Sequence, residues 1–177
     1  YKAHPSSIGP NLMAWQQTDN GSAIQNSAGA DSATDGDLDI AHALLMADTV
    51  WGSDGAINYK QAALAVMNDI MTYEVNQSDW VLQLGDWAHN TREGDTYYAA
   101  TRSSDFIVQY MPVFAEASGD TRWTTLYENT YRIINQMVDT YGTGILPDFI
   151  VKDSNGKFVP ASANLLESEH DGNFYYN

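Results

Sequence analysis

Three aspartates stand at alternate positions in the run Ser32-Ala33-Thr34-Asp35-Gly36-Asp37-Leu38-Asp39-Ile40-Ala41. The run comes just before a stretch of apolar residues at helical spacing. Acids at the start of a helix cap its free N–H groups and complement the positive end of its dipole. By spacing alone, the pattern favours Asp35 or Asp37 as a helix cap over a chemical role.

A calcium-binding loop is a second interpretation of the same run. Asp31, Asp35 and Gly36 suit positions one, five and six of an EF-hand loop. Position three is then Ala33, and position twelve is His42 where a bidentate glutamate is needed, so calcium is not expected. No pair among the histidines has the spacing of metal ligands on a helix; they are His4, His42, His89 and His170. We therefore predict neither a metal nor another cofactor.

The composition excludes several other chemistries and partners. The chain has no cysteine, so a thiol nucleophile and disulfides are excluded. It contains no glycine-rich phosphate loop and no Gly-x-Ser-x-Gly elbow, the motifs of phosphoryl transfer and serine hydrolysis. Its 23 acidic and 8 basic residues give a formal charge of −15, which repels nucleic acid and anionic membrane surfaces. The same charge favours a cationic polymer, although it also serves general solubility.

Apolar residues at helical spacing predict the elements that position these residues. The expected helices cover residues 38–51, 59–71, 106–114 and 123–141. Gly52-Ser53-Asp54-Gly55 breaks the first pair, Pro112 is expected to kink the third helix, and Asp120 is the expected N-cap of the fourth. Two helical hairpins joined by long, aromatic-rich loops indicate an all-α fold of the α/α barrel or toroid kind.

The rest of the chain is predicted as loops and short extended segments. Residues 79–102 are irregular, residues 145–152 are extended, and a turn follows at 153–157. No repeat or linker divides the chain, so residues 1–177 are predicted as a single domain. Both ends are abrupt, and we expect a fragment truncated at both ends whose apolar helix faces are covered by missing segments of the same parent chain.

The acidic run also carries a resemblance that outweighs the capping interpretation. From Ala33 to Ala47, followed by Trp51-Gly52, the sequence resembles the signature of glycoside hydrolase family 8. Three other segments agree with it: Pro10-Asn11-Leu12-Met13-Ala14-Trp15, Leu84-Gly85-Asp86-Trp87 and Arg102-Ser103-Ser104-Asp105. The likeness covers nearly the whole chain and is strongest to the branch of bacterial chitosanases and β-1,3-1,4-glucanases.

This resemblance implies part of the catalytic domain of a secreted enzyme, an (α/α)6 barrel with an open cleft, which cuts a β-1,4-linked polysaccharide internally with inversion. Such chemistry needs a carboxylic acid that protonates the leaving oxygen and a carboxylate that activates water, about 6.5–9.5 Å apart. Asp35 matches the family's acid that holds a distorted sugar beside the scissile bond. The family's proton donor lies in a Ser-Glu-Gly type motif ahead of the signature, and residues 1–34 contain none. The general acid is therefore expected outside this chain.

Two tryptophans match aromatic platforms of that cleft. Trp15 and Trp87 stand in predicted loops, where a flat ring can cover the apolar face of a sugar. Trp51 and Trp123 stand on helical stripes and are expected in the core, and Trp80 is left open.

Three polar residues of the matched segments are further candidates for substrate binding. They are Asp37, Arg102 and Asp105. We expect Asp35 to face the cleft, while Asp37 makes hydrogen bonds to the local backbone or a loop.

The general base is predicted from a departure from the family's common pattern. Most relatives have an aspartate after a tyrosine near the place where this chain stops, but here Tyr176 is followed by Asn177, whose amide cannot accept a proton from water at neutral pH. The chitosanase branch shares this asparagine and places its base glutamate about ten residues earlier, which leads to Glu167. We predict Glu167 as the base, Glu169 as the alternate, and Tyr176 and Asn177 as groups that orient the water. Ordinary solvated loop acids are the competing interpretation.

These residues predict an endo-acting, inverting glycanase, with chitosan as the leading substrate and mixed-linkage β-glucan or cellulose as the alternatives. The acidic balance fits a cationic polymer. A hypothesis of another class is a non-catalytic, carbohydrate-binding α/α domain. A cleft lined by Trp15, Asp35 and Trp87 supports a sugar site, whereas burial of all three indicates a scaffold.

Overall fold

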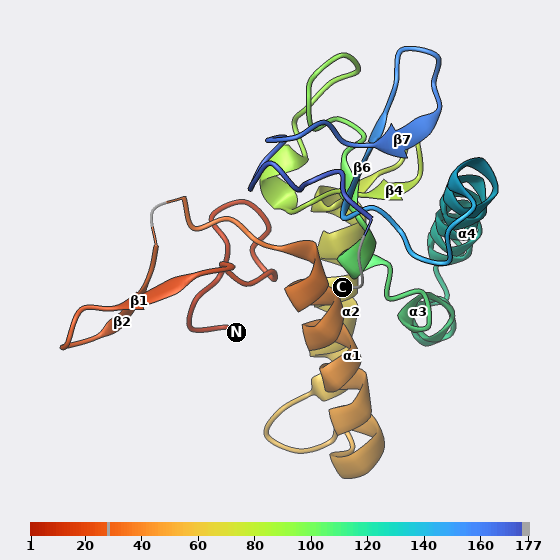
Figure 1. The fold of residues 1–177 in the computed structure, drawn as a ribbon. Coiled ribbons are helices and arrows are strands. Elements are labelled where there is room, and N and C mark those ends of the chain that lie inside the picture. Colours follow the sequence, from red (N-terminus) through yellow and green to blue (C-terminus); the bar gives the residue numbers. More distant parts are fainter. Residues whose placement is uncertain (28, 175–177) are drawn as a thin grey trace.

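The computed structural model describes residues 1–27 and 29–174 of the chain. Within these ranges it contains four α-helices, α1 (Thr34–Trp51), α2 (Tyr59–Tyr73), α3 (Tyr110–Ser118) and α4 (Arg122–Tyr141). Consecutive helices pack in pairs, α1 against α2 and α3 against α4 (Figure 1). The two predicted helical hairpins are therefore confirmed, although the third helix covers residues 110–118 and not the predicted 106–114.

Local sequence explains where most of the helices begin and end. The Asn58 side chain accepts a hydrogen bond from the Gln61 N–H (2.8 Å) and caps α2. Gly119 and Gly142 end α3 and α4 in the left-handed conformation, at φ 70° and 67°. Pro112 lies in the first turn of α3, where its missing N–H breaks no helical hydrogen bond, so the reason to expect a kink disappears.

The predicted N-cap Asp120 is wrong, and the competing interpretation of Asp35 or Asp37 as the cap of the first helix does not hold either. Helix α1 begins at Thr34 with Ala33 as its N-cap, and Asp35 and Asp37 lie inside its first turn. They complement the helix dipole without capping the helix, because the Asp37 carboxylate is engaged with another segment. The N-cap of α4 is Thr121, while the neighbouring Asp120 accepts the Arg122 N–H and pairs with the Arg122 guanidinium.

Three small antiparallel sheets accompany the helices. The predicted all-α class therefore describes the helical part of the chain but not these sheets. They are β1 (Gln17–Asp19) with β2 (Ile24–Asn26), β3 (Val75–Asn76) with β4 (Val81–Leu82), and β5 (Thr101–Arg102) with β6 (Phe149–Lys152) and β7 (Phe158–Pro160). Strand β6 lies in the segment predicted as extended. The β1–β2 hairpin projects away from the helices (Figure 1). Membership of a closed barrel of six helical pairs stays a prediction.

The main core lies between the helices, and the tryptophans differ in how far they are buried in it. Trp123 is buried, as predicted, and its ring packs against Phe114. Trp80 is half-buried against the same core. The prediction for Trp51 is wrong: the residue ends α1, contacts the Tyr59 ring and remains 72% exposed.

One face of α1 is apolar and uncovered among the described residues. Met46 and Val50, one helical turn apart, are exposed together with the neighbouring Trp51. Coverage of this face by another segment of a longer protein stays a prediction. None of the helices in the described part of the chain combines the length and the apolar content that crossing a membrane requires.

Candidate active site

A pocket of about 550 Å³ gathers site residues from five separate parts of the chain. Seven predicted site residues line it: Trp15, Asp35, Asp37, Trp87, Arg102, Asp105 and Glu167. The alternate base, Glu169, does not line the pocket. Tyr176 and Asn177 lie outside the described residues. Because residues as far apart in the sequence as Trp15 and Glu167 line it, the pocket is a tertiary feature.

The N-terminal segment and the start of α1 are joined at the pocket wall. The Trp15 N–H donates to the Asp31 carbonyl oxygen (2.8 Å), which places Trp15 close to Asp35 in the first turn of α1. Trp15 is 55% exposed and Asp35 is also exposed. A flat ring next to an accessible carboxylate can cover one face of a sugar and accept a hydrogen bond from its hydroxyl groups.

The second tryptophan comes from η1 (Asp86–Ala88), a short 3₁₀ helix. Trp87 is half-buried and packs edge-on against Tyr97, with ring centroids 5.1 Å apart. Gly85 allows this loop to approach the segment before α1, since a Cβ there would lie 2.2 Å from the Ser32 carbonyl oxygen. Trp15, Asp35 and Trp87 thus line one pocket and are not buried together in a core.

Asp37 faces inward from the same first turn that carries Asp35. It is 1% exposed, and its Oδ1 accepts the Met13 N–H at 2.9 Å, which confirms the expected loop hydrogen bond. Burial, with smaller contributions from the charges of Asp86 and Asp35, raises the pKa of Asp37 to about 7. So little of its surface is exposed that it has little capacity to bind a sugar hydroxyl directly.

Asp105 is a buried carboxyl group at the pocket wall. It ends η2 (Ser103–Asp105), is 4% exposed and accepts the Ser104 hydroxyl at 3.1 Å. Burial first and the charge of Asp35 second raise the pKa of Asp105 to about 8, against the opposing effects of Ser104 and Arg102. Its surroundings thus favour the protonated form of this carboxyl group.

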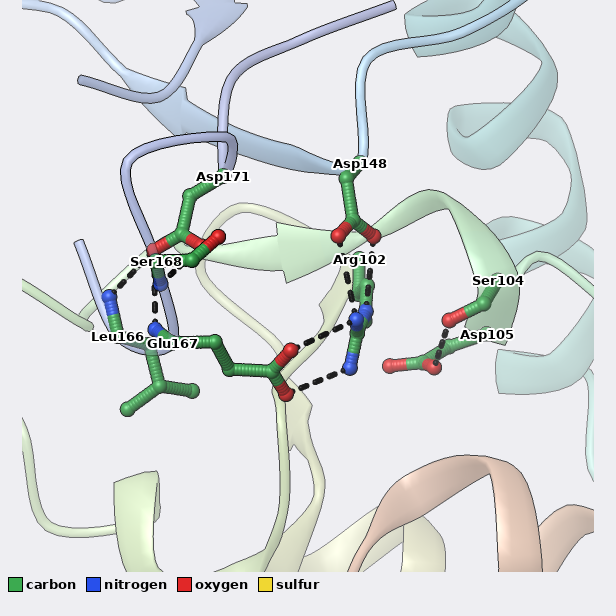
Figure 2. Close-up of polar contacts among 8 residues, drawn as sticks. All are labelled: Arg102, Ser104, Asp105, Asp148, Leu166, Glu167, Ser168 and Asp171. Carbon is green, nitrogen blue, oxygen red and sulfur yellow. Dashed lines mark hydrogen bonds and ion pairs between the residues drawn. The ribbon is translucent and has the colours of Figure 1, made fainter. Parts of the chain in front are cut away.

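Arg102 joins two carboxylates, Asp148 and Glu167, and lies beside Asp105 (Figure 2). Its Nε donates to Asp148 Oδ1 (2.8 Å) and its Nη2 to Asp148 Oδ2 (3.1 Å), while Nη1 and Nη2 donate to the two oxygens of Glu167 at 2.9 and 3.0 Å. Burial opposes the charge of Arg102, but hydrogen bonds and the charges of Asp148 and Glu167 raise its pKa. The guanidinium also lies over the Phe149 ring, 4.5 Å from its centroid.

Sequence reasoning missed Asp148, although it found Arg102 and Glu167. The pairing of Arg102 in β5 with Phe149 in β6 brings the neighbouring Asp148 against the guanidinium. Asp148 is buried, whereas the side chain of Glu167 is 50% exposed to the pocket. One carboxylate therefore anchors the arginine, and the other is accessible from the pocket.

The loop that carries Glu167 is organised by Asp171, a second residue that the sequence analysis missed (Figure 2). Its carboxylate accepts the N–H groups of Leu166, Glu167 and Ser168 at 2.7, 3.0 and 2.8 Å. Burial alone would raise the pKa of Asp171, but these backbone donors lower it below its usual value. The available signal in the sequence was the pair Asp171-Gly172. Residue 172 has to be glycine, because a Cβ there would lie 1.9 Å from the Ala161 carbonyl oxygen.

Replacing Asp171 by asparagine is expected to lower the free energy of unfolding by about 1–3 kcal/mol, because an amide NH₂ cannot accept backbone N–H groups. Chemical denaturation measures the loss. Glu169→Gln is the matched control, since Glu169 is an exposed acid of the same loop. Equal stability of the two variants would contradict the role assigned to Asp171.

Within residues 1–27 and 29–174, no group of three or more histidine, aspartate or glutamate side chains is arranged to hold a metal ion. The pocket instead combines tryptophan rings with carboxylates, the lining of a carbohydrate-active site.

Residues 2–173 match the family model of Glycosyl hydrolases family 8, and the chain belongs to this family. It is 50% identical to a beta-glucanase of Niallia circulans over all of this chain and 42% of that protein, and 38% identical to an endoglucanase of Bacillus sp. (strain KSM-330) over 99% of this chain and 36% of that protein. A solved β-1,3-1,4-glucanase structure from Paenibacillus sp. X4 superposes with a TM-score of 0.90 at 49% identity, over 97% of this chain and 44% of that one. The chain thus spans less than half the length of these relatives.

Proposed function

We propose that the protein containing this chain hydrolyses a β-1,4-containing glucan internally, with inversion at the anomeric carbon. The observation that carries the proposal is that Trp15, Asp35 and Glu167, from three distant segments, line one pocket with Trp87 and Arg102. The similarity to a beta-glucanase and endoglucanases supports a glucan as the substrate. We also propose secretion, since polymeric glucan is met outside the cell.

The pocket supplies one half of an inverting mechanism. A water molecule attacks the anomeric carbon, Glu167 takes its proton, and the bond from that carbon to the leaving oxygen breaks as a carboxylic acid outside this chain protonates that oxygen. The half-exposed carboxylate of Glu167, held on one side by Arg102, is suited to accept this proton. Tyr176 and Asn177 are proposed to orient the water.

The sugar beside the scissile bond is proposed to lie between the aromatic and acidic walls. Trp15 and Trp87 would cover apolar sugar faces, and Asp35 would accept a hydroxyl hydrogen bond that strengthens as the ring distorts toward the transition state. Asp105 would contribute a protonated carboxyl group below about pH 8.

Our proposed order of substrates reverses the order that the sequence predicts. Chitosan was placed first because the chain is acidic, and the pocket does contain several carboxyl groups. The names of the relatives favour glucans instead, and the engagement of Glu167 with Arg102 leaves less free negative charge for an amino sugar. We therefore place mixed-linkage β-glucan first, unsubstituted β-1,4-glucan second and chitosan third.

The test is hydrolysis by the purified full-length protein. Reducing ends and viscosity are followed on mixed-linkage β-glucan, carboxymethyl cellulose and chitosan, and proton NMR records which anomer appears first. We expect the highest rate on mixed-linkage β-glucan, an early fall in viscosity, and the α-anomer as the first product. Initial formation of the β-anomer would contradict inversion, and faster hydrolysis of chitosan would restore the original substrate order.

A non-catalytic carbohydrate-binding domain is the competing function. The exposed Trp15 fits binding as well as catalysis. Binding to the polymers without release of reducing ends would favour this alternative.

A further inference from the structure

A pair of buried carboxyl groups lies at the pocket wall and includes a residue to which the proposed mechanism assigns no role. Glu74 follows the last turn of α2 and is completely buried, and Asp37, in the first turn of α1, is 1% exposed. Asp86 of η1 is also completely buried nearby and interacts electrostatically with both. Three elements thus bring acidic groups together where water is excluded.

Most oxygens of this cluster have identified donors. The Ser32 hydroxyl donates to Glu74 Oε1 at 2.5 Å, and the Ser32 N–H donates to Asp86 Oδ1 at 2.9 Å. Asp86 Oδ2 accepts the Gly9 N–H at 3.0 Å and the Ser6 hydroxyl. Both carboxyl oxygens of Asp86 therefore have neutral hydrogen-bond donors.

The two remaining oxygens are Asp37 Oδ2 and Glu74 Oε2. Both are buried and have no hydrogen-bond partner among the described residues. The two carboxyl groups interact electrostatically with each other, and a proton on one of them would supply the donor that the two oxygens lack. Two adjacent buried carboxylates without that proton would repel each other strongly.

The charges around the pair favour retention of this proton. The facing charged groups are Asp86 from η1 and Asp35 from α1, both acidic, while Ser32 and the Met13 N–H supply neutral donors. Burial and then the charge of Asp37 raise the pKa of Glu74 well above its usual value.

We propose that Glu74 is a positioning residue of the glycosidase site: it shares a proton with Asp37 and thereby fixes the first turn of α1, which presents Asp35 to the substrate. The inference rests on the proposed function. Asp35 is only two residues from Asp37, and Ser32, which donates to Glu74, lines the same pocket. Loss of the shared proton would drive the two carboxylates apart and displace this turn.

Glu74→Gln tests the proposal because its amide supplies the hydrogen-bond donor at every pH. In the full-length protein, kcat of the variant is divided by kcat of the wild type from about pH 5 to 9, which cancels the titration of groups that both enzymes share. We expect this ratio to rise with pH on the order of tenfold, since each pKa unit corresponds to a tenfold change in protonation. A structural role alone would leave the ratio constant.

Two further variants keep the test decisive. Asp37→Asn places the donor amide on the other side of the pair and should show the same rise. Asp69→Asn is the matched control, because Asp69 is a buried acid of α2 that holds Asn11 and does not line the pocket; its ratio should stay flat. Circular dichroism checks that each variant is folded.

The outcomes separate this inference from the proposed function. A flat ratio for folded Glu74→Gln or Asp37→Asn in an active enzyme overturns the positioning role alone. A wild type inactive on every glycan overturns the proposed function and the positioning role with it. A rise that appears in both pair variants and not in Asp69→Asn supports the inference.

Discussion

Replacing Glu167 by glutamine in the full-length protein is expected to lower kcat by about 10²–10⁴-fold, the usual contribution of a general base. Glutamine is nearly the same size but cannot take a proton from the attacking water. Its side-chain oxygen can still accept one Arg102 N–H, so the loop retains part of its contact with the guanidinium. The loss should therefore appear mainly in kcat.

Azide distinguishes loss of the general base from distortion of the active site. Because azide attacks the anomeric carbon without giving up a proton, it should partly restore turnover of Glu167→Gln and yield a sugar azide of inverted configuration, detectable by mass spectrometry and NMR. Glu169→Gln, in the same loop, should keep near-normal activity. Near-normal activity of Glu167→Gln with a severe loss in Glu169→Gln would transfer the role to Glu169.

Replacing Asp35 by asparagine is the second large effect that we expect, a fall in kcat on the order of 10²-fold, equivalent to the several kcal/mol that transition-state hydrogen bonds to the sugar supply. Stability should change little, because Asp35 is exposed and its described hydrogen bond is with the adjacent Gly36 N–H. An asparagine oxygen can still accept that bond.

The measurement pairs kcat with the free energy of unfolding. Asp54→Asn is a suitable control, because Asp54 is an exposed acid just beyond the C-terminal end of α1, whereas Asp35 lies in the first turn. The 18 residues of this helix span about 27 Å, which separates the two acids. Loss of stability in Asp35→Asn with unchanged specific activity would assign Asp35 to the helix terminus and not to the sugar.

Protonation of the buried acids also has a consequence for stability. The pKa of Asp105 is raised in the folded state from 3.8 to about 8, so the folded protein binds a proton that the unfolded chain releases between these values. Its contribution is fully present below about pH 4 and is lost as pH rises through about 8. The raised pKa values of Asp37 and Glu74 act in the same direction.

The amino-acid sequence by itself determined the family, the two helical hairpins and seven residues that line the pocket. These features depend on local information. Apolar spacing specifies a helix within a few turns, and the run around Asp35 is continuous in the chain.

Only the tertiary structure decided which partners the polar groups have. Arg102 contacts Asp148 and Glu167, which are 46 and 65 residues away, and Ser32 contacts Glu74, which is 42 residues away. None of these three contacts has a periodic signal in the sequence. The same limit explains the error at Trp51, whose helical spacing matches that of a core residue although no described segment covers its side chain. The spacing of residues in the sequence indicates which side chains lie on the same face of a helix or strand. Burial and proton sharing depend instead on what packs against that face.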